Sequence, residues 1–186
     1  MAFQMKILKP VVAALLLVAV FFAMDRPVHA GEAELLAELK TAPESDAKRL
    51  ERELALIWDS SGSPAMDLLL KRGREALEQD DSARAIEHFS ALTDHAPEFA
   101  EGWHARATAF YQAGLYGPAL DALERALALN PNNFNAIFGL GVMFQEFGDL
   151  ERAVRAYAQV LELHPHHENA KAAMERLENS GIRRTL

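Results

Sequence analysis

Residues of the same kind return every 34 positions along this chain, and four separate sets of residues share that spacing. Four sets in phase at one period do not arise by chance. A 34-residue period is typical of stacked helix–turn–helix units, each of which buries its apolar face against its neighbours. The spacing therefore predicts an all-α solenoid. The four sets are Ala85, Ala119 and Ala153; Pro97, Pro131 and Pro165; Gly73, Ala107 and Gly141; and Phe89, Leu123 and Tyr157.

The middle unit, residues 100–133, contains the pattern of two helices. Apolar residues four apart, such as Trp103 and Ala107, place one apolar face on the first helix. Gly114 is expected to end that helix, because glycine adopts the left-handed conformation at little cost. The second helix is expected to end at Pro131, which cannot continue it.

Three successive segments share one order of bulky and small residues. The residues that carry it are Leu69, Gly73, Ala85, Phe89 and Pro97 in the first segment; Trp103, Ala107, Phe110, Ala119, Leu123, Ala126 and Pro131 in the second; and Ile137, Leu140, Gly141, Phe144, Gly148, Ala153, Tyr157 and Pro165 in the third. This order resembles the signature of the tetratricopeptide repeat (TPR) family. The resemblance covers residues 66–167, with Asp80 in place of the turn glycine of the first segment. It implies an α-solenoid of three TPR units.

The repeats leave flanking segments at both ends. We expect the three TPR units at residues 64–99, 100–133 and 134–167. Residues 168–186 are expected to form a C-terminal capping helix and tail. Residues 31–63 are expected to form a helical N-terminal cap, because the ends of a solenoid need covering.

Local signals divide the predicted N-terminal cap into two helices. The first is expected over residues 32–40. Thr41 and Glu44 have the spacing of a capping box, which predicts that the second helix begins there and runs to Trp58. We expect Ile57 and Trp58 to pack this cap on the first repeat. The alternative is a mobile arm that binds a partner.

Residues 1–30 have the composition of a secretory signal peptide. A basic start containing Lys6 and Lys9 precedes the uncharged apolar run 11–24, and small residues lead to Ala30. This order predicts cleavage after Ala30. The apolar run is shorter than the roughly 20 residues that a spanning helix needs, which favours cleavage over retention as an anchor. The predicted location is therefore periplasmic or secreted, as in the small exported TPR proteins of Gram-negative bacteria that the chain resembles.

Composition limits the chemistry and the partners. The chain contains no cysteine, which excludes disulfides, a lipid-modified cysteine and a cysteine nucleophile. Its formal net charge is −8, and acidity of this size disfavours nucleic acid and anionic membranes as partners. The alternative explanation of the charge is solubility. No catalytic or phosphate-binding motif occurs, so we expect neither an enzyme nor a cofactor.

The resemblance also indicates where a partner would bind. The first helix of each TPR unit lines a concave groove, and the residues at the groove-facing positions combine apolar anchors with hydrogen-bonding side chains. The alternative for some of these positions is packing between helices. The predicted groove residues are Leu70, Arg74, Glu101, His104, Thr108, Tyr111, Gln112, Asn135, Phe138 and Gln145.

One type of groove is not expected here. TPR domains that clamp the C-terminal carboxylate of chaperones use a ring of Lys, Arg and Asn side chains. Arg74 is the one cation among the matching positions of this chain, so the charge-assisted hydrogen bonds to a free carboxylate would be missing. The matching positions hold Leu70, Arg74, Ala105, Asn135 and Gly139.

Three functions fit these observations. The leading hypothesis is a non-catalytic module in the periplasm that binds a peptide or helix of an envelope or secreted protein in the groove. A second is self-association, with a weak homo-oligomer as its form. A third is metal binding by the loop from His164 to His167, whose imidazoles are close in sequence; polar loop composition explains that loop without a metal.

Overall fold

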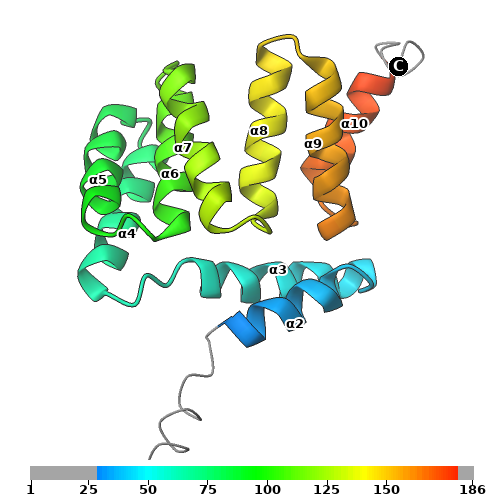
Figure 1. Ribbon diagram of the computed structural model, residues 1–186, viewed down its shortest axis with the longest axis horizontal. Helices are drawn as coiled ribbons and strands as arrows, with labels where there is room; N and C mark the ends of the chain where they lie inside the picture. Colours follow the sequence, from blue (N-terminus) through cyan, green and yellow to red (C-terminus); the bar gives the residue numbers. More distant parts are fainter. Residues whose placement is uncertain (1–28, 180–186) are drawn as a thin grey trace, which may run out of the picture. The chain divides into compact units, whose positions relative to one another are not determined.

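Helices joined by short turns make up the part of the chain that the computed structural model describes, residues 29–179 (Figure 1). No strand occurs in that range. The helices are α2 (His29–Leu39), α3 (Glu44–Trp58), α4 (Pro64–Glu78), α5 (Ser82–His95), α6 (Ala100–Gln112), α7 (Tyr116–Leu129), α8 (Phe134–Glu146), α9 (Leu150–Leu163) and α10 (Glu168–Asn179).

The helices from α4 to α9 form three hairpins in series. Helix α4 packs on α5, α6 on α7, and α8 on α9; α5 then contacts α6, and α7 contacts α8. The hairpins stand side by side in Figure 1, with α10 against α9 at the C-terminal end. The predicted all-α solenoid of three helical hairpins is therefore confirmed. The packing described here and below lies within one compact unit that begins at Leu35, and residues up to Glu34 form a separate unit.

Close contact between the two helices of a hairpin explains two of the 34-residue sets. Gly73 lies against the ring of Phe89, and Gly141 lies against the ring of Tyr157. A Cβ atom added at Gly141 would stand 2.5 Å from that ring, closer than atoms can approach. In the middle hairpin Ala107 and Leu123 share a core cluster. A small residue on one helix thus makes room for a large one on the other.

The turn inside each hairpin requires a left-handed residue at one repeat position. Gly114 and Gly148 have φ angles of 72° and 75°, and Asp80 has a φ angle of 58° at the equivalent place. Asp and Asn tolerate this conformation better than other side chains. Asp80 therefore performs the same geometric role as the two glycines, and the departure from the TPR signature leaves the turn intact.

The start of α3 differs from the predicted capping box. The cap residue of α3 is Pro43, and no side chain caps the helix. The hydroxyl of Thr41 donates instead to the carbonyl oxygen of Glu38, at 3.4 Å. The prediction was wrong because the chain turns between α2 and α3 at Thr41 itself, which draws its hydroxyl back to the preceding helix.

The position of α3 differs from the prediction as well. The ring of Trp58 packs in the third repeat, where it meets the ring of Phe134 edge to face, with centroids 5.0 Å apart. Figure 1 shows α3 crossing near the ends of α8 and α9, and the shared core is built from all three helices together with α2 and α10. Its buried members are Leu36, Leu39, Ala47, Leu50, Leu54, Trp58, Phe134, Ile137, Ala156, Val160 and Ala170.

Helix α10 covers the C-terminal end of the stack. Ala173 and Leu177 of this helix share a core cluster with Ala153 and Tyr157 of α9. The predicted signal segment lies outside the described residues except for its last two positions, His29 and Ala30, which open α2. The tail at residues 180–186 also lies outside them. Among the described helices, none combines the length and apolar character needed to cross a bilayer.

The contact between Gly141 and Tyr157 makes a prediction about stability. Replacement of Gly141 by Ala should lower the free energy of unfolding by roughly 1–3 kcal/mol, because the added methyl group collides with the ring. Denaturant unfolding would measure it. Gly117→Ala is the control: open space surrounds Gly117 in α7, so its replacement should stabilise the helix by up to about 1 kcal/mol. Equal effects of the two changes would contradict this account of the 34-residue sets.

Candidate functional site

A hollow of about 350 Å³ lies on the face that α6 and α8 share. Its floor is mainly apolar, and polar side chains stand at its edges. Half-buried aromatic side chains surrounded by hydrogen-bonding groups are typical of surfaces that bind proteins. The lining residues are His104, Ala107, Thr108, Tyr111, Ala119, Leu123, Asn135, Phe138, Gly139, Val142, Met143, His167 and Asn169. We call this the groove hollow.

Two aromatic residues define the walls of the groove hollow. The ring of Phe138 lies between those of Tyr157 and His167, with centroids 5.4 and 5.3 Å away, so its position is fixed by packing. Tyr111, on α6, also lines the hollow and contacts Tyr116, with ring centroids 5.6 Å apart. Its hydroxyl donates to Glu146 at 3.4 Å.

Half of the predicted groove residues line this hollow. They come from two helices and combine an aromatic anchor on each side with hydrogen-bonding groups between them. Thr108 is exposed, and Tyr111, Asn135 and Phe138 are half-buried. The members of the predicted set that meet here are His104, Thr108, Tyr111, Asn135 and Phe138.

The other predicted groove residues lie elsewhere. Leu70 is 2% exposed and belongs to the core of the first repeat, so its prediction as a contact residue is wrong: its side chain fills the space between α4, α5 and α6. Gln112 is exposed but does not line the hollow. Gln145 accepts a hydrogen bond from the hydroxyl of Tyr157, at 3.1 Å.

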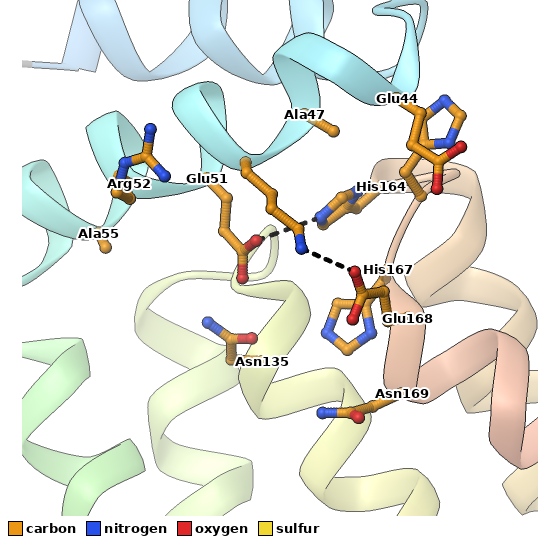
Figure 2. A pocket seen from close by; sticks show the side chains of 12 residues that line it. Glu44, Ala47, Glu51, Arg52, Ala55, Asn135, His164, His167, Glu168 and Asn169 are labelled. Carbon is orange, nitrogen blue, oxygen red and sulfur yellow. Dashed lines mark ion pairs between the residues drawn. The ribbon is translucent and has the colours of Figure 1, made fainter.

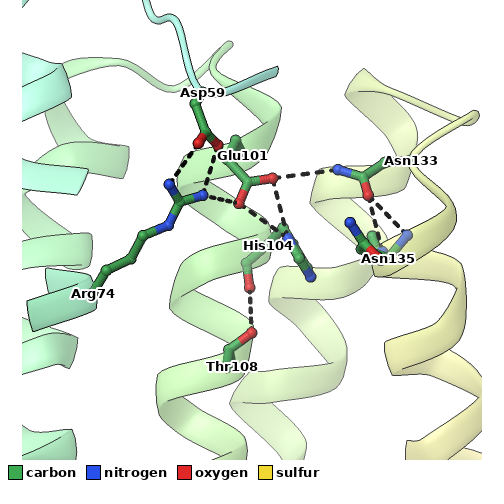
Figure 3. A network of polar contacts seen from close by, with 8 residues as sticks. Asp59, Arg74, Glu101, His104, Thr108, Asn133 and Asn135 are labelled. Carbon is green, nitrogen blue, oxygen red and sulfur yellow. Dashed lines mark hydrogen bonds and ion pairs between the residues drawn. The ribbon is translucent and has the colours of Figure 1, made fainter. Parts of the chain in front are cut away.

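Arg74 and Glu101 belong to a polar network behind the groove hollow (Figure 3). The guanidinium of Arg74 donates two hydrogen bonds to the carboxylate of Asp59, both 2.7 Å long, and a third of 2.8 Å to Glu101. The other side of Glu101 faces His104, whose Nδ1 lies 3.1 Å from Oε2. Asn133 donates to the same oxygen at 3.4 Å. Glu101, only 7% exposed, is thus surrounded by partners.

The network shifts the pKa values of its two central groups. Burial alone would lower the pKa of His104, but the charge of Glu101 and the hydrogen bond to it outweigh burial, and the pKa is raised. Burial likewise opposes the charge of Glu101, yet His104 and Arg74 together lower the pKa of its carboxyl. Each group therefore favours the charged form of the other.

The same network disfavours the binding of a carboxylate at Arg74. Arg74, the single cation among the positions that match a carboxylate clamp, is neutralised by Asp59 and Glu101. A free carboxylate entering the groove would have to displace two carboxylates that are already bound. The structure therefore supports the expectation that this groove does not clamp a C-terminal carboxylate.

The loop histidines are packing residues in this structure. His164 is buried with its ring edge to face with that of Phe134, 5.2 Å away. Burial lowers the pKa of His164 to about 4, so the ring is neutral. His166 reaches the carbonyl oxygen of Ala42 at 3.1 Å. Within residues 29–179, no group of three or more acidic or histidine side chains is placed to hold a metal ion.

His167 and Asn169 line the groove hollow and were missed by the sequence reasoning. His167 occupies the position before α10 that Asn133 occupies before α8. The side chain of Asn133 accepts from the amides of Asn135 and Ala136, and Nδ1 of His167 accepts from the amide of Ala170 at 3.1 Å. A polar residue at this repeat position was the available signal, because such residues cap the helix that follows.

Three helical hairpins stacked in series define a helical-repeat protein. Family models and known proteins agree on which kind. Two tetratricopeptide repeat models match the chain, over residues 70–134 and 110–177. A TPR repeat-containing protein of Rhizobium etli is 26% identical over 145 residues, which are 77% of this chain and 71% of that protein. The chain belongs to the tetratricopeptide repeat family.

Solved structures of the same fold include two informative cases. The first TPR domain of Spaghetti (RPAP3), bound to the HSP90 peptide SRMEEVD, has a TM-score of 0.59 at 23% identity and covers 62% of this chain and 91% of that one. MamA has a TM-score of 0.58 at 26% identity and covers 63% of this chain and 70% of that one. Both are similar to the stack of hairpins described above.

The raised pKa of His104 makes a prediction about pH. Its contribution to stability is fully present below 6.5, the pKa of an unfolded histidine, and is lost as the pH rises through its higher value in the folded protein. The free energy of unfolding should therefore fall above pH 6.5 in the wild type. In His104→Gln this part of the pH dependence should disappear.

Denaturant unfolding between pH 5 and pH 9 would measure the effect, and nuclear magnetic resonance would follow the titration of His104 directly. The buried loop histidines do not interfere, because their lowered pKa values act below 6.5. Identical pH dependence of the two proteins above 6.5 would show that the ion pair with Glu101 does not hold the proton on His104.

Proposed function

We propose that this protein is an exported, non-catalytic interaction module that holds a segment of another protein in its groove hollow. The observation that carries the proposal is the hollow itself. Phe138 and Tyr111 face it from α8 and α6, and Thr108 and Asn135 supply hydrogen-bonding groups between them. Such an arrangement binds by apolar burial and is oriented by a few polar contacts.

The fold supports a peptide as the occupant. In the solved structure of the first TPR domain of Spaghetti, a domain of this fold holds a peptide of HSP90. The groove hollow of the present chain has a volume of about 350 Å³ and a mainly apolar lining, which suits the side chains of a bound segment. Because Phe138 and His104 are fixed by their neighbours, the surface loses little conformational freedom on binding.

Export is the part of the proposal that depends on the sequence alone. The basic start, the apolar run and the small residues before Gly31 support a cleaved signal and a periplasmic or secreted mature protein. Mass spectrometry of the protein recovered from cell fractions tests it. A mature chain that begins at Gly31 outside the cytoplasm supports export; an intact Met1 in the cytoplasm excludes it.

In-cell photocrosslinking tests the groove hollow as the working surface. The crosslinking residue is placed at Thr108, which is exposed and lines the hollow, and the matched control carries it at Glu124, which is exposed on α7. One dominant foreign protein captured from position 108 and not from position 124 supports the proposal. Adducts to the same chain alone would favour self-association instead.

Thr108→Arg makes the proposal testable with purified protein. The long side chain should fill the hollow and weaken binding of the captured partner by at least about tenfold, which corresponds to roughly 1.4 kcal/mol. Circular dichroism should show unchanged helicity, because Thr108 is exposed on a helix. Ala128→Arg, at an exposed position of α7, adds the same charge away from the hollow and should bind normally. Equal binding by both variants would move the site off the groove.

A further inference from the structure

A second hollow, of about 440 Å³, lies beneath α3 (Figure 2). One wall is the face of α3 that carries Glu44, Lys48, Glu51 and Arg52. The opposite wall is made by the start of α8, the loop before α10 and the first residues of α10. We call this hollow the α3 cleft. It lies where α3 packs against the third repeat.

The α3 cleft and the groove hollow share part of their lining. Asn135, His167 and Asn169 line both. These three polar side chains therefore stand where the two hollows adjoin, and we call them the crossing.

The side chains at the crossing are suited to a polypeptide backbone. Because Nδ1 of His167 accepts the amide of Ala170, the proton of this neutral ring lies on Nε2, which is a donor. Burial lowers the pKa of His167 and keeps it in this form. The side-chain amides of Asn135 and Asn169 make no hydrogen bond within the described residues, and each can both donate and accept.

The charges of the α3 cleft favour a cation. Three carboxylates face two basic side chains, and the histidine beside them is neutral. Lys48 pairs with Glu168 at 3.0 Å. The nearest basic atom to Glu51 is Nε2 of the neutral His164, at 3.7 Å, beyond hydrogen-bond distance. Within the described residues neither Glu44 nor Arg52 makes an ion pair, so the three carboxylates of the cleft exceed its two cations by one.

His164 is a buried, neutral member of the cleft lining. It is 2% exposed, and burial lowers its pKa to about 4. Its Nε2 lies toward Glu51, and its Nδ1 has no hydrogen-bond partner among the described residues. The ring therefore supplies no positive charge that would balance Glu51.

We propose that the groove hollow and the α3 cleft together bind one extended segment of a partner protein, in which an apolar side chain occupies the groove hollow and a lysine or arginine enters the cleft beside Glu44 and Glu51. This inference rests on the proposed function and adds the chemistry of the partner. The net charge of −8 favours the same kind of segment, because it attracts basic partners over acidic ones.

Synthetic peptides test this inference without knowledge of the partner. The probe is a pool of short, fluorescein-labelled Gly–Ser peptides. Each peptide carries two Leu residues and one Lys, and the pool contains every spacing between these residues. Two matched pools carry Gln or Glu in place of Lys. Fluorescence anisotropy should show the Lys pool binding about two- to five-fold more tightly than the Gln pool, as expected for a partly exposed ion pair, and the Glu pool binding most weakly.

Variants of α3 test whether the preference for Lys peptides arises in the α3 cleft. Glu44→Gln combined with Glu51→Gln should abolish the advantage of the Lys pool over the Gln pool. Arg52→Gln removes a cation from the same wall and should increase that advantage. Opposite effects of changes on one helix face exclude general damage to α3, and circular dichroism should show equal helicity in all variants.

The outcomes separate this inference from the proposed function. If all pools bind equally and Thr108→Arg abolishes their binding, the groove hollow is the site and the extension into the α3 cleft is wrong. If a pool binds but Thr108→Arg has no effect, both proposals fail. If no pool binds, the inference is overturned, while photocrosslinking from position 108 still decides the proposed function.

Discussion

Close approach of the two helices in each hairpin is the constraint on which the rest of the structure depends. Gly141 admits the ring of Tyr157, and Gly73 admits that of Phe89. Without these contacts the first helices would stand farther from the second ones, and neighbouring hairpins could not stack at a constant interval. The groove hollow is a consequence, because Phe138 is positioned through its contact with the same Tyr157.

The repeats could be predicted from the sequence because their packing is local and recurs. A residue such as Ala107 or Leu123 meets partners a fixed number of positions away, so three copies of the pattern report one geometry. The same regularity placed Tyr111 and Phe138 on one face, where the structure brings them to one hollow. Asp80 adopts the turn conformation that the glycines adopt elsewhere, so even the departure from the pattern preserved its geometry.

What the sequence did not predict depends on contacts that occur once. Trp58 packs on Phe134, a residue far along the chain, and no repeated spacing predicts that contact. Leu70 was placed in the groove by analogy with other repeats, but in the first repeat this position is buried. The network of Asp59, Arg74 and Glu101 joins a loop to two repeats. The positions of these residues are set by the path of α3, which the period does not describe.

The path of α3 also affects how the stack can deform. In helical-repeat proteins each repeat contacts mainly its neighbours along the chain, so neighbouring hairpins can change their relative angles. Here α3 is anchored in the core of the third repeat, and Asp59, directly after it, is bound to Arg74 of the first repeat. Glu101 extends that connection to the second repeat. Helix α3 therefore connects the third repeat to the first two by a second route, separate from the contacts between neighbouring hairpins.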